Sequence, residues 1–305
     1  MSDVIDQAIP QSPQEAFEPE TDRRQRRRGR RGRVGKVGWP IYLLLIIAVI
    51  ISVFPLYYMF VIASVGASAV TSIPPRLYPG LNFFDIAAKV FETVPFLQSL
   101  LNSVIVSLSI AVISAVLCAL AGFAFAKLTF PGRNVLFVIV LLTMTVPSQL
   151  SVIPQYLIIS WLDWVDSLQA IIVPGLASAF GIFWMRQHMA TTLNDELMQA
   201  ARIDGANSWQ IFWRIGFPVV RPAVFVLGLI NFTAVWNDFM WPFIVLKSPE
   251  LFTVQIALKQ LQANRTIDLA LTMGGSFMAT LPLLIVFFFV GRRMVAGIMD
   301  GAFKG

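Results

Sequence analysis

Residues that could perform catalysis or hold a metal ion are scarce in this sequence. The chain has one cysteine, Cys118, and one histidine, His188, and neither stands in a CxxC, HExxH or other metal-ligand pattern. No nucleophile–base pair is evident, and the GxxxxGK[ST] loop that cradles nucleotide phosphates is absent. We therefore expect no enzyme activity, no metal site and no cofactor, and any use of ATP would need a separate protein.

Asp238 is the one carboxylate well inside an apolar stretch, and an ionisable group in that position is a functional candidate by default. Its neighbours Asn231, Trp236 and Asn237 add hydrogen-bonding groups and a flat aromatic face. Sugars present hydroxyl groups and an apolar ring face, so these four residues are candidates for a substrate pathway. The alternative is a hydrogen bond between helices near the membrane surface, where tryptophan is common in any case.

The composition indicates that these residues are part of a membrane protein. Of 305 residues, 57% are hydrophobic and 13% are charged, whereas soluble domains carry about 25% charged residues. A helix needs about 20 apolar residues to cross the hydrocarbon core of a bilayer. We expect an all-α membrane protein with six transmembrane helices, at residues 41–65, 101–125, 135–159, 167–184, 223–245 and 270–290.

The basic residues predict the topology. Nine of the 23 Lys and Arg residues lie in the tract RRQRRRGRRGRVGK, residues 23–36, directly before the first apolar stretch. Such an excess marks the cytoplasmic side and attracts anionic lipid, so we expect both termini in the cytoplasm. Residues 1–38 have few large apolar side chains and are predicted to be a disordered tail. Residues 39–305 are predicted to form one membrane domain, without a nucleic-acid partner.

Small residues recur at every fourth position in the second apolar stretch, and that spacing keeps them on one helix face. They are Ser99, Ser103, Ser107, Ala111, Ala115 and Ala119. A face of this kind lets a neighbouring helix approach closely. The neighbour is either another helix of the same chain, which is the simpler interpretation, or a helix of a partner subunit.

Prolines interrupt the third apolar stretch at Pro147 and Pro154. A proline in a membrane span frees backbone carbonyl groups, which is tolerated where protein or a water-filled cavity can satisfy them. The polar residues around the two prolines are Ser148, Gln149, Ser151 and Gln155. This pattern predicts a segment that faces either a polar pathway or a partner subunit.

Residues 191–222, with the sequence TTLNDELMQAARIDGANSWQIFWRIGFPVVRP, form a long polar segment between two apolar stretches. Asn194 can cap a first helix by accepting a hydrogen bond from a backbone amide. The apolar residues Leu197, Ala200 and Ala201 are spaced to share one face of that helix. The segment therefore predicts a short amphipathic helix outside the bilayer.

A second helix is predicted directly after the first. Gly205 can end the first helix, because glycine accepts the left-handed backbone found just past a helix end. Asn207 and Gln210 match the capping-box pattern at the start of the second helix. We expect Pro218 to end this helix before the next span. On physical grounds alone, the pair is equally compatible with a helical hairpin that lies on the lipid surface.

The same residues resemble the EAA loop of binding-protein-dependent ABC importer permeases, whose pattern is E-A-A, three residues, G, nine residues, I, one residue, L-P. Gln199 stands where the family usually has Glu, and Phe217 stands where it usually has Leu. The resemblance implies an ATPase-coupling role, within a coupling loop at about residues 191–218, for Gln199, Ala200, Ala201, Asp204, Gly205, Ala206, Ile215 and Pro218.

The resemblance covers most of the chain. AGFAFAKLTFPGR (residues 121–133), AVWNDFMWPFIVL (234–246) and VAGIMDGAFKG (295–305) are similar to segments of carbohydrate importer permeases of the maltose-permease partner type. This similarity implies a type I ABC importer permease fold in the bacterial inner membrane. It also implies that the chain forms half of the translocation pathway for a carbohydrate, with a di- or oligosaccharide as the expected cargo.

The resemblance also implies the partners. These are a second permease subunit in a heterodimer, a dimer of cytoplasmic ATP-binding subunits, an extracellular or periplasmic solute-binding protein, the sugar and the lipid bilayer. The helix at Gln199 to Gly205 would dock in a groove of the ATP-binding subunit and pass its movement to the spans. The alternative function is an ion-coupled secondary transporter, which would need several buried ionisable groups, whereas only Asp238 qualifies.

Overall fold

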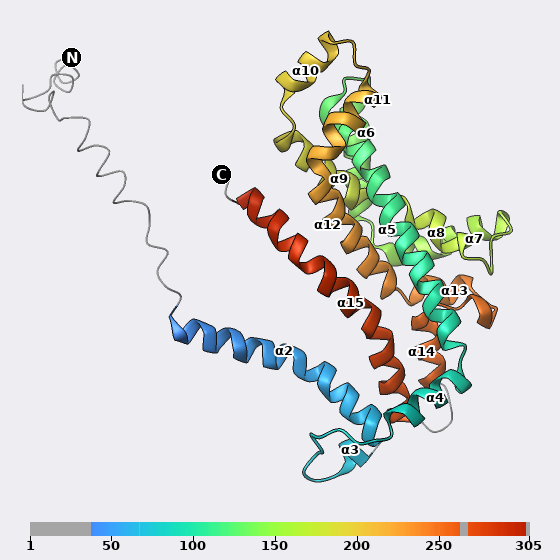
Figure 1. The fold of residues 1–305 in the computed structure, drawn as a ribbon. Coiled ribbons are helices and arrows are strands. Elements are labelled where there is room, and N and C mark those ends of the chain that lie inside the picture. Colours follow the sequence, from blue (N-terminus) through green and yellow to red (C-terminus); the bar gives the residue numbers. More distant parts are fainter. Residues whose placement is uncertain (1–37, 67, 263–267, 303–305) are drawn as a thin grey trace, which may run out of the picture. The chain divides into compact units, whose positions relative to one another are not determined.

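The computed structural model describes residues 38–66, 68–262 and 268–302. In this part of the chain every regular element is helical, which confirms the all-α prediction (Figure 1). The elements are α2 (Trp39–Val65), α3 (Ser68–Thr71), α4 (Phe83–Thr93), α5 (Phe96–Lys127), α6 (Arg133–Thr145), η2 (Ser148–Ser151), α7 (Val152–Trp161), α8 (Gln169–Gly175), α9 (Ala179–Thr192), α10 (Asp195–Ile203), α11 (Ser208–Ile211), η3 (Phe212–Gly216), α12 (Phe217–Trp236), α13 (Met240–Val245), η4 (Pro249–Leu251), α14 (Val254–Gln262) and α15 (Leu269–Ala302).

The internal contacts divide the chain within α2 into two units, Met1–Pro55 and Leu56–Gly305. The described part of the first unit is the beginning of α2, whose side chains are mostly exposed and apolar, as expected of a helix in contact with lipid. The predicted tail at residues 1–38 lies outside the described residues, apart from residue 38.

Five described helices are long and apolar enough to cross a membrane, and a broken pair makes six if it counts as one span. The five are Trp39–Val65, Phe96–Lys127, Gln169–Thr192, Ser208–Trp236 and Leu269–Phe289. Each of them overlaps one of the predicted spans. The third predicted span corresponds to the broken pair, Arg133–Thr145 and Ser148–Trp161, which bends by 98°.

Proline chemistry explains the bend in the third span. Val146 has an extended backbone (φ −78°, ψ 120°), the conformation that a residue before proline prefers, and it ends α6. Pro147 then leads into the short 3-10 helix η2, from which α7 continues in a new direction. Because of this break, the polar side chains of η2 and of the start of α7 are not part of one continuous apolar helix.

Two predicted helix ends were wrong. Pro218 does not end the second helix of the polar segment, because the chain forms a π-helical turn over Phe212–Gly216 and continues into α12. In this turn the amide of Phe217 bonds to the carbonyl of Phe212, five residues earlier. The wider turn accommodates a residue that lacks an amide hydrogen. The fifth span ends at Trp236 rather than near residue 245, since residues 237–239 separate α12 from α13.

Helix α5 forms the centre of the second unit, and α9 and α12 run alongside it (Figure 1). The stripe of small residues on α5 is buried inside this chain, which confirms the simpler interpretation. Its polar end holds a distant loop: the amide of Asn102 donates to the carbonyl of Glu250 at 2.8 Å, and the hydroxyl of Ser103 accepts from the amide of Val254 at 2.8 Å. The buried face of α5 therefore packs against neighbouring helices and also holds the segment at residues 250–254.

We predict that Gly122→Ala destabilises the α5–α9 contact. A Cβ atom at Gly122 would lie 2.7 Å from Cβ of Met185 and 2.8 Å from the backbone nitrogen of Arg186. Because backbone must move to relieve this overlap, we expect a loss of about 1–3 kcal/mol in unfolding free energy, measured by thermal unfolding in detergent. The matched control is Gly228→Ala, whose added atom lies no nearer than 3.4 Å to any neighbour. Equal melting temperatures for the two variants would contradict the prediction.

Candidate functional site

Helix α10 has the caps that its sequence predicts. The side chain of Asn194 accepts a hydrogen bond from the amide of Glu196 at 2.9 Å. Gly205 follows the helix with φ +85°, and its amide bonds to the carbonyl of Arg202 at 3.0 Å. The amide of Ala206 bonds to the carbonyl of Ala201 at 2.9 Å, which completes a Schellman motif. The ends of α10 are therefore fixed by local hydrogen bonds.

One face of α10 is held against the protein and the other is exposed. Met198 is 5% exposed and Ala201 packs beside it, on a core that includes Ile211 and Phe212 of the next helical turns. We expected Leu197, Ala200 and Ala201 to share one face of the helix. This was wrong for Leu197 and Ala200, because both are exposed. The sequence argument missed Met198, whose long unbranched side chain reaches the core where an alanine would not.

The exposed surface of α10 and of the turn after it carries four of the eight predicted coupling residues. Gln199, Ala200, Asp204 and Gly205 are exposed. Ile203, whose side chain is 88% exposed, adds a large apolar group to them. The described residues thus present a short helix with a mixed polar and apolar outer surface, and this is the kind of surface that a protein partner covers.

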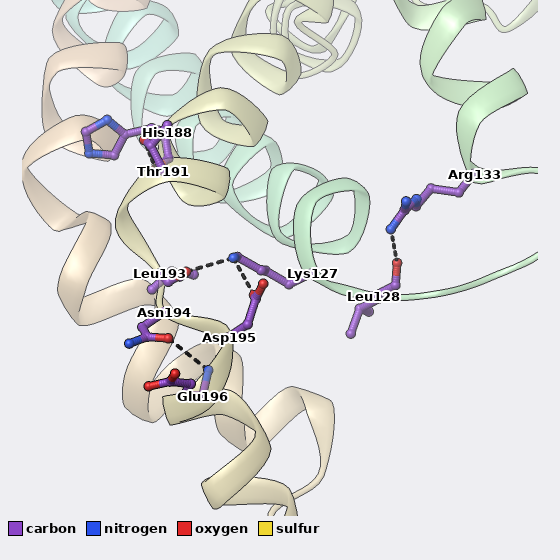
Figure 2. Close-up of polar contacts among 9 residues, drawn as sticks. All are labelled: Lys127, Leu128, Arg133, His188, Thr191, Leu193, Asn194, Asp195 and Glu196. Atoms are coloured by element: carbon purple, nitrogen blue, oxygen red, sulfur yellow. Dashed lines mark hydrogen bonds and ion pairs between the residues drawn. The ribbon is translucent and has the colours of Figure 1, made fainter. Parts of the chain in front are cut away.

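Lys127, at the end of α5, attaches α10 to the membrane helices (Figure 2). Its ammonium group donates to the carbonyl of Leu193 at 2.7 Å and forms an ion pair with Asp195 at 2.6 Å. The Lys127 side chain is 6% exposed, whereas that of Asp195 is 74% exposed. Sequence reasoning missed this contact, because Lys127 and Asp195 are 68 positions apart in the chain.

The second helix of the segment continues directly into α12. Asn207 and Gln210 form the predicted capping box, with bonds of 2.8 and 3.0 Å. Phe212 is buried, and its ring centre lies 4.9 Å from that of Trp213. Ile215 and Pro218, both partly exposed, lie within the continuous helical path from α11 to α12. The path from α11 to α12 is therefore continuous helix, and the turn at residues 204–207 joins it to α10.

A second candidate site is an open cavity of about 330 Å³, which we call the Asp238 cavity. It is lined by residues of α5, η2, α7, α8, α12 and α13. Of these, α8 lies beside α5 (Figure 1), and α13 contacts both α7 and α8. Its polar lining comes from Asp238 and from the broken third span. The lining residues are Ile110, Ser148, Gln149, Val152, Gln155, Ile171, Pro174, Gly175, Val235, Asp238, Met240 and Trp241.

Trp241 is fixed in place at the cavity, and Asp238 lies beside it. The indole nitrogen of Trp241 donates to the carbonyl of Ala170 in α8 at 3.0 Å. The carboxylate of Asp238 lies near the backbone amides of Met240 and Trp241, at the start of α13. The cavity wall therefore combines a carboxylate with a held aromatic ring.

The other three residues predicted for the substrate pathway do not line this cavity. Asn231 donates to the hydroxyl of Ser114 at 3.3 Å. Trp236 is 3% exposed and stacks on Phe232. Asn237 is exposed and donates to the carbonyl of Thr233 in the preceding helix, α12. The structure thus brings Asp238 together with Ser148, Gln149 and Gln155 rather than with its sequence neighbours.

Asp166 links the turn between α7 and α8 to the turn after α13. Its carboxylate accepts from the Ser248 hydroxyl and from the amides of Ser248 at 2.9 Å and Lys247 at 2.8 Å. Its own amide donates to the carbonyl of Val245 at 2.8 Å. The bonds from Ser248, then that from Lys247, hold the pKa of Asp166 below its ordinary value.

We predict that this connection opens in acid. A carboxyl group with a lowered folded-state pKa stabilises the fold above its unfolded pKa of about 3.9, and the effect is lost as the pH falls through the lower folded value. Exchange protection of the Lys247 and Ser248 amides should be constant from about pH 8 to 5 and decrease below about pH 4. Hydrogen–deuterium exchange, corrected for intrinsic rates, measures this. Asp166→Asn should remove the pH dependence, and Asp163→Asn should not; a decrease that survives in Asp166→Asn would contradict the assignment.

Comparison with known proteins agrees with this architecture. Residues 111–296 match the family model described as "Binding-protein-dependent transport system inner membrane component". The chain is 32% identical, over 260 residues, to the arabinooligosaccharides transport system permease protein AraQ of Bacillus subtilis strain 168, covering 82% of this chain and 92% of that protein. It is 30% identical, over 255 residues, to the sn-glycerol-3-phosphate transport system permease protein UgpE of Escherichia coli strain K12, covering 81% and 90%.

A solved structure shares the fold. A chain of a bacterial ABC transporter involved in the import of the acidic polysaccharide alginate superposes with a TM-score of 0.72 at 23% identity, covering 90% of this chain and 98% of that one. The matches confirm the predicted permease class and the prediction that the chain is not an enzyme. The chain belongs to the family of binding-protein-dependent transport system inner membrane components.

Proposed function

We propose that this chain is a permease subunit of an ATP-driven importer of a carbohydrate, and that it forms half of the translocation pathway. A second permease subunit would form the other half. Two copies of a separate ATP-binding subunit would drive the cycle, and a solute-binding protein would deliver the cargo. The family membership and the relatives named for transport of arabinooligosaccharides and sn-glycerol-3-phosphate support this proposal.

The observation that carries the proposal is the attachment of α10. This helix has an exposed outer surface, a core contact through Met198 and a charged contact through Lys127 at the end of α5. Its far end continues through a tight turn at Gly205 into the helical path to α12. A short helix held at both ends to different spans suits the transfer of a rigid displacement from an ATP-binding subunit to the membrane domain.

The same proposal predicts the orientation of the chain in the membrane. An ATP-binding subunit works in the cytoplasm, so α10 faces the cytoplasm. Basic side chains near α10 agree with this side of the membrane, because cytoplasmic loops carry an excess of Lys and Arg. They are Lys127, Arg133, Arg202, Arg214 and Arg221. Both termini then lie in the cytoplasm, in a multi-pass protein of the bacterial inner membrane.

The test is co-purification of the complete importer with wild-type chain and with Asp204→Lys and Gly205→Pro. Asp204 is exposed, so reversal of its charge changes the docking surface without disturbing the core. Proline cannot adopt the φ of +85° at Gly205 and lacks the amide that bonds to Arg202. We expect both variants to reach the membrane at wild-type level but to retain less ATP-binding subunit and to lose cargo-stimulated ATP turnover.

Three results would contradict the proposal. Unchanged subunit association and turnover in both variants would leave α10 as a helix on the lipid surface. Uptake that follows an ion gradient without ATP would support a secondary transporter instead. The purified chain alone should neither bind nor hydrolyse ATP, and measurable hydrolysis by the pure chain would also contradict a separate ATP-binding subunit.

A further inference from the structure

We propose that the Asp238 cavity is a cargo subsite that accepts uncharged carbohydrate and disfavours anionic cargo. The inference rests on the proposed function and adds the chemical class of the cargo. It starts from the polar groups that the fold gathers from two distant parts of the chain. Ser148, Gln149 and Gln155 come from the broken third span, and Asp238 follows α12.

The lining matches the hydrogen-bonding pattern of sugar hydroxyls. A carboxylate accepts hydrogen bonds, and each glutamine amide both donates and accepts. Among the described residues, the amide of Gln155 has no hydrogen-bond partner although its side chain is partly buried at the cavity. The Asp238 carboxylate has about four lone-pair positions. Even beside the amides of Met240 and Trp241, acceptor positions therefore remain for a ligand.

The cavity also offers an aromatic surface. The indole of Trp241 uses its nitrogen for the carbonyl of Ala170, so the ring rather than the polar tip is left for contact. Ile110, Val152 and Val235 add apolar surface to the lining. A mixed lining with a small number of fixed polar groups is typical of small-molecule sites, and a volume of about 330 Å³ lies at the lower end of their usual range. The cavity is large enough for one or two sugar rings.

The charge of the lining decides which cargo fits. Asp238 is the one ionisable side chain among the residues that line the cavity. Lys247 lines a different cavity and donates to the carbonyl of Ile244. A phosphate or uronate in the Asp238 cavity would thus meet a carboxylate without a compensating cation. Two like charges about 4 Å apart at a protein surface repel strongly enough to weaken binding by at least about tenfold.

The cargoes named for the related transporters differ in charge. The relatives include a permease named for arabinooligosaccharides and a permease named for sn-glycerol-3-phosphate, and the matched structure is an importer of an acidic polysaccharide. Arabinooligosaccharides are uncharged, whereas the other two cargoes are anions. The lining of this cavity places the present chain with transporters of uncharged cargo.

The experiment uses the complex of this chain with its partner permease and ATP-binding subunits in lipid nanodiscs, without the solute-binding protein. Ligand-observed saturation-transfer NMR compares two probes at equal concentration: arabinotriose, which is uncharged, and sn-glycerol 3-phosphate. For the wild type we expect at least about tenfold stronger transfer to arabinotriose. Asp238→Asn should reduce this preference at least about fivefold, because asparagine has nearly the same shape as aspartate but carries no charge.

Two further variants test the site itself. Gln155→Leu should reduce transfer to arabinotriose several-fold, although Asp238 and Trp241 are unchanged. Asp163→Asn removes a carboxylate from an exposed turn outside the cavity, at a position with φ of +54° that asparagine accepts, and should change nothing. If the Asp238→Asn preference equals that of the wild type, Asp238 does not select the cargo and the inference is wrong. Absent transfer to arabinotriose, or stronger transfer to the phosphate in the wild type, would also overturn it.

The same samples distinguish failure of this inference from failure of the proposed function. ATP-binding subunit retained with the chain, and ATP turnover by the complex, test the proposed function alone. A complex that keeps both but shows no effect of Asp238→Asn overturns the cargo inference only. A chain that retains no ATP-binding subunit overturns the proposed function, whatever the NMR result.

Discussion

Ala200→Trp should abolish cargo-stimulated ATP turnover in the reconstituted importer while leaving the chain folded in the membrane. Ala200 is exposed on α10, so the larger side chain meets no atom of this chain's core. It would stand between α10 and any subunit that docks there. A well-packed interface position contributes about 2 kcal/mol or more, so we expect at least about a thirtyfold loss of turnover. The measurement is ATP hydrolysis with and without cargo and binding protein.

Asn134→Trp is the matched control for this prediction. Asn134 is exposed at the start of α6 and lies outside α10, so the same bulk is added where no docking is proposed. Turnover in this variant should stay within about twofold of wild type, as for most exposed substitutions. If Ala200→Trp is as active as Asn134→Trp, then α10 is not the docking element, and the exposed surface of this helix needs another explanation.

The second large effect is expected for Lys127→Met. Methionine keeps the length of the side chain but leaves the carbonyl of Leu193 and the carboxylate of Asp195 without their shared partner. An unsatisfied polar group in a buried position costs about 1–3 kcal/mol, which is enough to free the start of α10 from α5. We expect uptake to decrease by about tenfold while basal ATP hydrolysis persists, because α10 then moves without α5.

Asp195→Asn separates the two contacts of Lys127. The carboxylate of Asp195 is mostly exposed, and exposed ion pairs contribute about 0–1 kcal/mol. Asparagine can also accept from Lys127, so this variant should keep at least about half of wild-type uptake. A loss of ATP hydrolysis in step with uptake in Lys127→Met would indicate general destabilisation rather than uncoupling. Hydrogen exchange of the peptide containing α10 reports directly whether the helix has been released.

Local features of the polar segment could be predicted from the sequence because their causes are local. Asn194, Gly205 and Asn207 act through hydrogen bonds or backbone conformation within a few residues, and the structure has all three as expected. Pro218 was misjudged because its effect depends on the preceding turn. The π-helical turn at Phe212–Gly216 accommodates proline, which lacks an amide hydrogen. Nothing in the local sequence pattern distinguishes this outcome from a helix end.

The residues predicted for the substrate pathway show where prediction from the sequence fails. Asp238 was found because a carboxylate in an apolar stretch is unusual, and it lines the cavity. Trp236 was grouped with it by proximity in the sequence, but the helix turns its ring into the core beside Phe232. Gln155 has no neighbour in sequence that links it to Asp238. Side chains a few residues apart diverge at the end of a helix, so sequence distance is a poor guide to a shared cavity.

The sequence by itself determined the membrane class, the number of apolar helices and the caps of α10, since these follow from composition, length and short-range hydrogen bonds. Only the tertiary structure decided which polar groups meet. Lys127 and Asp195 are 68 positions apart, and Gln155 and Asp238 come from different helices. Their meeting depends on how α5, α9 and α12 pack around buried small residues. The stripe of small residues predicts which face of α5 is packed, but the shapes of surfaces that are distant in the chain set which helices pack against it.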